Sequence, residues 1–304
     1  MNGNPLFTRR KKRRSRFKRD TVNPPRMKIT ERDIQIVKSV SELRFATAKQ
    51  IALFINSNLQ TARIRLYLLW QNRLLDRVDL PLFVGEGSPP SIYVVGSHGR
   101  RLIAEQLGID PGKVSRVDSS RNYYFLLHHT LRRNDFRSAM LAACRDREDL
   151  DFLFWKQDRA VGDIIFIEND RGHHVRVPLV PDGFMCIQTP KGSMCAYVEI
   201  DRGTIGHRKF KLKQRGYYEW WKQKGYVDRY GVRNFRVLTV TTNDRRMGNL
   251  IRTTIKASDS GRGSGFFWFT TFDRINLENP SSIFEPIWYR AISDYDRPMA
   301  LIPE

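Results

Sequence analysis

The chain has 304 residues, of which 40% are hydrophobic and 12% aromatic, so it has enough apolar side chains to form cores and is not a disordered protein. At roughly 100–200 residues per domain, this length predicts two domains. The 53 lysines and arginines outnumber the 32 acidic residues, and the formal charge of +21 predicts a polyanionic partner, nucleic acid before membrane.

The lack of a recognisable targeting signal and the cysteine content both predict a protein inside the cell. The sequence has no apolar run long enough to span a bilayer, and the first seven residues lack the apolar core of a secretory signal. The three cysteines, Cys144, Cys186 and Cys195, form no Cys-x-x-Cys pair. Their odd number favours buried thiols in a reducing compartment. We therefore expect a cytoplasmic protein with no membrane partner.

Residues 1–27 are expected to form a disordered basic arm. Nine of the eleven residues from 9 to 19 are lysine or arginine, and like charges repel while the run offers little to bury. Pro24 and Pro25 then mark the edge of the folded part. The arm either lies along DNA phosphates and releases counterions, or is a solvated tail or localisation signal. The basic residues expected to contact phosphates are Arg9, Arg10, Lys11, Lys12, Arg13 and Arg14.

Residues 28–110 have the pattern of a winged helix-turn-helix domain. Thr30 is a good N-cap, and Asp33 at the third helical position completes a capping box. The apolar residues that follow have the spacing of one face of a helix. Two apolar runs around a Gly/Pro/Ser turn predict a β-hairpin wing. Helices are expected at 31–43, at 48–55 after Thr47, at 59–75 after Ser57 or Asn58, and at 97–107, with the hairpin at 76–95.

The third of these helices is the expected DNA-reading element. In winged helix-turn-helix proteins its N-terminal part enters the major groove, where glutamine can pair with adenine and arginine with guanine. The alternatives are a merely solvated face or a module that docks a protein. The residues expected to face double-stranded DNA are Gln60, Thr61, Arg63, Ile64, Arg65 and Tyr67.

Residues 120–304 alternate strand-like and helical runs, which predicts an α/β or α+β domain. It opens with a basic helix that is expected to pack Leu131, Phe136, Met140 and Leu141 inward. Strands are expected at 152–155, 162–168, 175–188, 193–201, 234–242 and 265–272, a tight turn at 189–192, and helices at 206–224 and 245–254.

Three acidic residues lie near strand ends of this domain. Asp182 follows Pro181, and Glu199 and Asp201 lie two residues apart on the next strand, which puts them on the same face. The hairpin between the strands should bring Asp182 within reach of Glu199. Clusters of carboxylate oxygens suit Mg²⁺ or Mn²⁺, and such an ion can position a water and stabilise charge on a scissile phosphate. The sequence therefore predicts a metal site of Asp182, Glu199 and Asp201.

A lysine-rich helix follows the acidic strand. Lys209 and Lys213 are four residues apart and share a helix face, which Tyr217 continues. A lysine near the metal can stabilise the developing charge or orient the water. The alternative is a solvated or phosphate-contacting surface for the lysines, and simple packing for Tyr217. His129 is likewise either a packed helix residue or one that reaches the acidic centre.

These motifs together resemble the replication-relaxation family of plasmid and mobile-element proteins. The resemblance lies in the Val-Pro-Asp turn at 180–182, the Glu-x-Asp-Arg-Gly-Thr run at 199–204 and the lysine-rich helix with Tyr217, behind the winged-helix pattern. It covers about residues 28–250. The resemblance implies a role in plasmid replication and DNA relaxation, and a second domain similar to the PD-(D/E)XK nucleases.

The resemblance also assigns nuclease residues, with one departure. Asp182 matches the motif's aspartate and Glu199 its second acidic residue, but Asp201 stands where the motif has lysine. Either a helix lysine substitutes, Lys213 ahead of Lys209, or the domain binds DNA without cutting. Three hypotheses therefore stay open: a Mg²⁺-dependent enzyme that nicks DNA, a catalytically silent replication or transcription regulator, and an adaptor that docks replication or mobilisation proteins on DNA.

Overall fold

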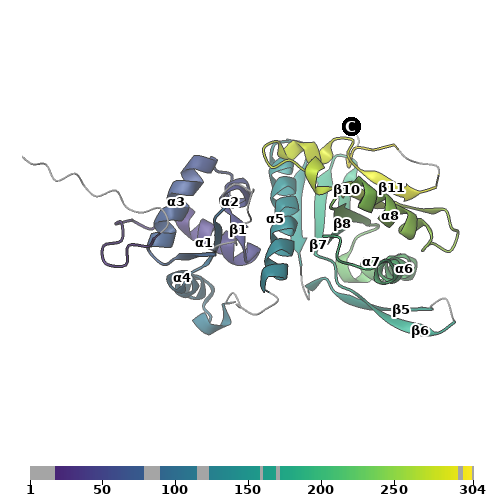
Figure 1. Cartoon of the computed structure of the whole chain (residues 1–304), viewed down its shortest axis with the longest axis horizontal. Coiled ribbons are helices and arrows are strands. Elements are labelled where there is room, and N and C mark those ends of the chain that lie inside the picture. The colour runs from purple at the N-terminus through teal and green to yellow at the C-terminus, as the bar shows by residue number, and fades with distance from the viewer. Residues whose placement is uncertain are drawn as a thin grey trace, which may run out of the picture. The chain divides into compact units, whose positions relative to one another are not determined.

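The computed structural model describes residues 18–78, 90–114, 123–157, 160–168, 172–293 and 297–302. Its helices and strands form an α+β protein, as predicted (Figure 1). The chain divides into two compact units, which we call unit one and unit two. Unit one contains the described residues 18–48, 57–78 and 90–114, and unit two contains 49–56 and the described residues from 123 onward. Most of the predicted basic arm, and the tip of the predicted wing at 79–89, lie outside the described residues.

Unit one follows the predicted element order. Thr30 caps the first helix in a capping box with Asp33, since the Thr30 side chain accepts from the Asp33 N–H and the Asp33 carboxylate accepts from the Thr30 N–H. Asn58 is the cap of the third helix. Within the described residues, the helices of unit one are α1 (Glu31–Leu43), α3 (Leu59–Gln71) and α4 (Ser97–Leu107), and its strands are β1 (Ala46–Thr47), β2 (Leu75–Val78) and β3 (Ile92–Val95).

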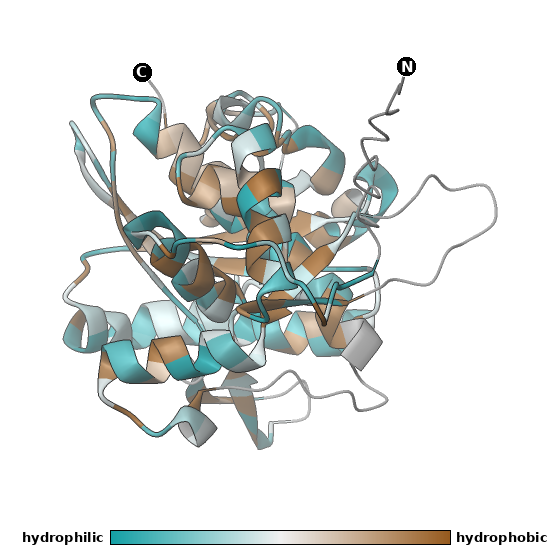
Figure 2. Cartoon of the chain, turned by 90° about the vertical axis from the view of Figure 1, so that its left-hand side faces the viewer, coloured by the Kyte–Doolittle hydropathy of each residue, from teal (hydrophilic) through white to brown (hydrophobic). Residues whose placement is uncertain are grey.

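A small antiparallel sheet and one apolar core hold unit one together. The strand order is β1-β3-β2, so the two strands of the predicted hairpin pair with each other. Helices α1 and α3 contribute fully buried side chains that include Val37, Val40, Leu66 and Leu69. The amphipathic colouring of the helices in Figure 2 agrees with this, since hydrophobic and hydrophilic residues lie on different sides of a surface helix. None of the helices in the described residues is both long and apolar enough to cross a membrane.

Helix α2 (Ala48–Phe54) forms as predicted, and from Lys49 onward it is grouped with unit two. Its buried Gln50 donates from Nε2 to the Leu131 carbonyl (2.9 Å) and to Asp135 Oδ1 (2.7 Å). Both partners lie on α5 (Tyr123–Arg145), the helix that opens the second predicted domain. The prediction for α5 is half correct: Phe136 and Met140 are buried, whereas Leu131 and Leu141 are only half-buried.

The body of unit two is a six-stranded sheet of order β11-β10-β9-β8-β7-β4. Strands β4, β7 and β8 form an antiparallel meander, and β8, β9 and β10 run parallel. One face packs on α5, and the other on α6 and α8 (Figure 1). The bounds are β4 Asp151–Lys156, β7 Gly183–Thr189, β8 Gly192–Ile200, β9 Arg236–Thr241, β10 Gly263–Thr271, β11 Tyr289–Ile292, α6 His207–Gln223, α7 Gly225–Tyr230 and α8 Asp244–Ile255.

A separate two-stranded ribbon covers α6. It pairs β5 (Asp163–Glu168) with β6 (His174–Leu179) and packs on α6. The single strand expected over 175–188 is therefore wrong, because the chain leaves the ribbon at residues 180–182 and enters the central sheet as β7. Helix and ribbon approach closely at Gly216, where an added Cβ would lie 2.9 Å from Leu179 Cδ2, so only glycine fits without a shift.

The cysteines differ from the prediction of free thiols. The β7–β8 register places Cys186 directly opposite Cys195, and a disulfide joins them. Sequence spacing did not show this pairing, because the bond depends on strand register rather than on a Cys motif. Cys144 is a buried free cysteine, and burial raises the pKa of its thiol to about 12. It is therefore expected to be chemically inert in the folded protein.

Candidate functional site

Asp182 and Glu199 lie at one end of the central sheet. Asp182 directly precedes β7, and Glu199 is the penultimate residue of β8. The Asp182 N–H donates to the Val198 carbonyl (2.9 Å), and Asp182 Oδ2 accepts from the Ile200 N–H (2.7 Å). Backbone pairing between the start of β7 and the end of β8 thus fixes the Asp182 carboxylate beside the end of β8, as the predicted hairpin required.

Lys213 of α6 completes this site. Its Nζ lies 2.5 Å from Glu199 Oε2 and 3.0 Å from the Val180 carbonyl oxygen. Glu199 is 8% exposed, and burial raises the pKa of its carboxyl, with the Lys213 charge opposing and the Asp182 charge adding to the increase. A carboxylate so deeply buried needs a nearby cation to stay ionised, and Lys213 provides it.

Tyr217 and His129 hold the two carboxylates from either side. The Tyr217 hydroxyl, fully buried one turn beyond Lys213, donates to Glu199 Oε1. His129 Nε2 of α5 lies 3.3 Å from Asp182 Oδ1. Burial would raise the pKa of Asp182, but its hydrogen bond with His129 and the nearby positive charges lower it overall. We call Asp182, Glu199, Lys213, Tyr217 and His129 the acidic–lysine cluster.

Asp201 lies outside this cluster, so the predicted convergence of three carboxylates is wrong. Its carboxylate accepts from Arg246 Nε (2.9 Å) and Nη2 (3.1 Å) of α8, and from the Thr241 hydroxyl (2.6 Å). Strand β8 ends at Ile200, one residue before Asp201, and the Asp201 carboxylate is directed to Arg246 rather than to Lys213. In the part of the chain that the structure describes, no group of three or more His, Cys, Asp or Glu side chains is placed to hold a metal ion.

Of the two candidate lysines, the structure brings only Lys213 to the carboxylates. Lys209 is exposed on the first turn of α6. Tyr217 packs in the core and also lies on the face of Lys213, and its hydrogen bond to Glu199 was not predicted. The spacing from Lys213 to Tyr217, one helical turn on the same face, was the signal that pointed to it.

The comparisons with known proteins agree with the sequence motifs. The model of the replication-relaxation family matches residues 37–234, which include α3 and every member of the acidic–lysine cluster. The chain belongs to the replication-relaxation family. Family membership indicates a role in the replication or relaxation of a plasmid or mobile element. Searches of curated proteins and of solved structures gave no significant match.

The replication-relaxation protein presents part of the predicted DNA-reading set on α3. Gln60, Thr61 and Arg63 are exposed, and Ile64 is 53% exposed. Tyr67 is half-buried and packs against the Trp70 ring, with ring centroids 5.9 Å apart.

Arg65 is instead engaged inside unit one. Its Nε donates to Asp33 Oδ1 (2.8 Å) and its Nη2 to Asp33 Oδ2, and Asp33 is fully buried. Burial would raise the pKa of Asp33, but the hydrogen bond from Arg65 and those from Thr30 lower it. Arg65 is therefore the counter-charge of a buried carboxylate, and of the predicted set it is the least suited to contact DNA.

Arg19, within the predicted basic arm of residues 1–27, is anchored to unit one. Arg19 donates from Nε to the Trp70 carbonyl (2.8 Å) and from Nη2 to the Leu75 carbonyl (3.0 Å) and Asp76 Oδ1 (2.6 Å). Residues 18–27, which were also expected to be disordered, are described in the structure, and Arg19 is held there by unit one. The arm residues from Arg9 to Arg14, which carry the DNA prediction, lie outside the described residues.

Proposed function

We propose that this replication-relaxation protein binds double-stranded DNA of a plasmid or mobile element and nicks it at the acidic–lysine cluster with Mg²⁺ or Mn²⁺. One observation carries the proposal: Asp182, Glu199 and the Lys213 amine gather at one end of the sheet, with Lys213 Nζ 2.5 Å from Glu199 Oε2. Two carboxylates and a lysine are the groups that the nuclease motif requires. The motif position two residues after Glu199 holds Asp201, which is paired with Arg246, so the proposal takes the lysine from α6.

The donor set of the cluster fits the proposed ion. Mg²⁺ prefers carboxylate oxygens, and protein sites often give it only one or two carboxylates and leave the remaining positions to water. Asp182 and Glu199 would hold the ion. When bound, the ion would lower the pKa of a coordinated water and neutralise charge on the phosphate.

The side chains of the cluster have separate roles in this proposal. Tyr217 and His129 orient Glu199 and Asp182 through the contacts described above. Lys213 would stabilise negative charge as water attacks phosphorus and the bond to the leaving sugar oxygen breaks. The products are a phosphomonoester and a free hydroxyl on one strand.

A plasmid-nicking assay tests the proposal. Supercoiled plasmid is incubated with the protein and Mg²⁺ or Mn²⁺, and open circles are measured over time. Glu199→Gln is expected to lower the rate by about 100-fold or more, because it removes one of the two charged oxygen ligands. Glu219→Gln, a carboxylate on the surface of α6 paired with Lys222, is the matched control and should retain activity. Equal rates for wild type and Glu199→Gln would contradict the proposal.

A catalytically silent DNA-binding regulator is the second candidate, and one observation favours it. Both carboxylate oxygens of Glu199 already accept hydrogen bonds, one from Tyr217 and one from Lys213, which is a stable arrangement without an ion. If the wild-type protein retards plasmid in a gel but leaves it supercoiled with either ion, the regulator is the better account.

Substitutions of two nearby arginines of α3, Arg63 and Arg65, are expected to have different effects, one on DNA binding and one on stability. Arg63→Ala is expected to weaken duplex binding by about 1–3 kcal/mol without changing stability, because Arg63 is exposed. Arg65→Ala is expected to destabilise the protein by about 3 kcal/mol, because it leaves the buried Asp33 carboxylate without its cation. Fluorescence anisotropy with a labelled duplex and urea unfolding measure the two effects. Equal affinities for wild type and Arg63→Ala would argue against DNA contact through α3.

A further inference from the structure

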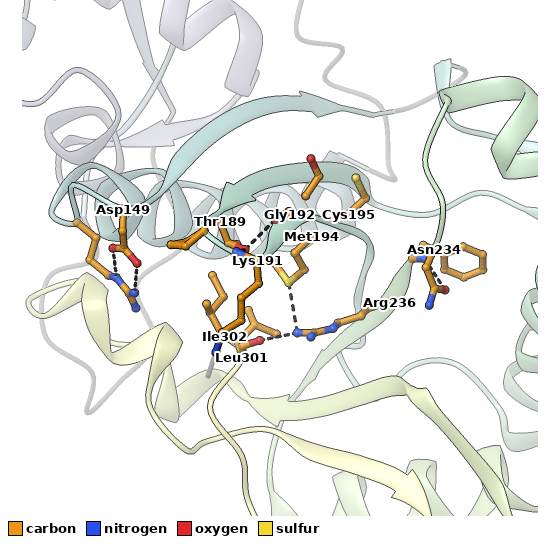
Figure 3. Close-up of a pocket in the computed structure, with 14 residues that line it drawn as sticks. Asp149, Thr189, Lys191, Gly192, Met194, Cys195, Asn234, Arg236, Leu301 and Ile302 are labelled. Carbon is orange, nitrogen blue, oxygen red and sulfur yellow. Dashed lines mark hydrogen bonds and ion pairs between the residues drawn. The ribbon is translucent and has the colours of Figure 1, made fainter. Parts of the chain in front are cut away.

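A cavity of about 400 Å³ lies at the other end of β7 and β8 from the acidic–lysine cluster. Asp182 precedes β7 and Glu199 closes β8, whereas the cavity is lined by the turn that ends β7 and begins β8. The start of β9 and the described C-terminal residues Leu301 and Ile302 complete the lining (Figure 3). The volume is within the range of roughly 300–1,000 Å³ of small-molecule sites.

Arg236 is the charged group at the centre of the lining. Its Nη1 donates to the Leu301 carbonyl and lies 3.3 Å from Met194 Sδ, as the dashed lines in Figure 3 show. Its guanidinium carbon lies 4.5 Å from the centroid of the Trp268 ring. Burial, and then the charge of Arg290, lower the pKa of Arg236 to about 10.

Arg236 has no counter-ion among the described residues. Its contacts there are a carbonyl oxygen, a thioether and an aromatic ring, and none is a carboxylate. A partly desolvated guanidinium without an anion is unfavourable, and a bound carboxylate, sulfonate or phosphate would relieve this cost through a charge-assisted, bidentate contact. Arg147, another basic residue of the lining, is already paired with Asp149 at 2.5 Å.

The rest of the lining is largely apolar, and a disulfide holds one part of it in place. Met194, Phe235, Leu301 and Ile302 supply apolar walls, and Lys191 lies on the exposed turn. The disulfide between Cys186 and Cys195 joins the two strands that carry this turn. The cavity is therefore largely formed before a ligand enters, which lowers the entropy lost on binding.

We propose that this cavity binds an amphipathic organic anion, with the anionic group at Arg236 and the apolar part against Met194, Leu301 and Ile302. A phosphate of the DNA backbone would satisfy the charge but not the apolar walls. A small molecule that carries both features satisfies both. The site is separate from the acidic–lysine cluster, so the inference does not depend on DNA nicking.

Methyl NMR on the whole chain, labelled at methionine, tests the inference. The probe is naphthalene-1-sulfonate, and its uncharged sulfonamide is the ligand control. The Met194 methyl signal, assigned by its loss in Met194→Leu, is expected to shift saturably with the sulfonate. The sulfonamide is expected to bind at least tenfold more weakly, because it has no charge to pair with Arg236.

Protein variants complete the test. Arg236→Met should weaken sulfonate binding at least tenfold, and Arg252→Met, which removes an exposed arginine of α8, should not. If Arg236→Met does not fold, Ser193→Asp on the exposed turn provides the same test by adding a negative charge to the lining. No saturable shift, equal binding of sulfonate and sulfonamide, unchanged affinity in the folded Arg236→Met or in Ser193→Asp, or displacement of the probe by duplex DNA would each overturn the inference.

Discussion

Replacing Lys213 by methionine is expected to destabilise the protein by about 3–5 kcal/mol at neutral pH. Lys213 is the ammonium beside Glu199, whose carboxyl is 8% exposed. Methionine fills a similar volume but leaves this carboxylate without a cation, and removal of one partner of a buried ion pair is costly. Urea unfolding measures the loss. Lys209→Met, an exposed lysine on the same helix, is the control and should change stability little.

The loss should also depend on pH. Burial raises the folded-state pKa of Glu199 above its ordinary value of 4.5, and removal of Lys213 raises it further. Below pH 4.5 the carboxyl is neutral in both the folded and the unfolded state, so the Lys213→Met loss is smallest there. As the pH rises toward the folded-state pKa, the unfolded chain releases this proton first, so the variant loses stability. A loss that stays constant from pH 4 to pH 8 would contradict this account.

A double variant isolates the Lys213–Glu199 interaction. Glu199→Gln together with Lys213→Met removes both charges, so no ion is left buried alone. Its stability is expected to exceed that of Lys213→Met alone at neutral pH, with a coupling of about 2 kcal/mol or more in the double-mutant cycle. Additive effects of the two substitutions would mean that the pair does not interact in solution.

Deletion of residues 9–19 is expected to make DNA binding much less sensitive to salt. This segment holds nine basic residues, and each phosphate that a cation neutralises adds about 0.9 to the slope of log affinity against log salt. If about six of the nine contact phosphates, the slope falls by about 5. Between about 50 and 200 mM salt, the wild-type affinity then falls about 1,000-fold more than that of the deletion. Anisotropy titrations over a range of salt concentrations measure both effects.

The order of residues within this arm should matter little. A chain with the same eleven residues in scrambled order keeps the charge and should keep the wild-type salt slope, because phosphate attraction depends on the number of cations rather than on their sequence. An unchanged slope after deletion would assign the arm to another role, such as a localisation signal. Arg63→Ala should differ from the deletion, since one arginine changes the slope by about 1 at most.

Local signals predicted the elements of this fold well. The capping box at Thr30 and the helical period after it gave α1, and the turn at 189–192 gave the β7–β8 hairpin. The single strand expected over 175–188 failed for a physical reason. Apolar residues are frequent on both sides of Pro181, and this content cannot show that the two halves pair with different partners. The Cys186–Cys195 disulfide was missed because its geometry depends on that pairing.

The candidate site was predicted in part. Asp182 and Glu199 come together because a tight hairpin joins their strands, which is local information. Asp201 was misplaced because its partner, Arg246, lies 45 residues further along the chain on another helix. The sequence favoured Lys213 over Lys209 as the substitute for the motif lysine. In the structure, the way α6 packs places Lys213 beside Glu199 and leaves Lys209 exposed. That packing depends on the ribbon formed by β5 and β6, whose pairing the sequence pattern did not reveal.

The absence of a side chain at Gly216 lets α6, which carries Lys213, lie close against the ribbon. Gly216 lies three residues beyond Lys213 and directly before Tyr217, against Leu179 and Val177 of β6. A methyl group there would require the Leu179 side chain to move. If α6 shifted as well, Lys213 and Tyr217 would move with it. Relatives that carry a larger residue at this point could keep every charged group of the cluster and still hold the amine out of reach of its carboxylate.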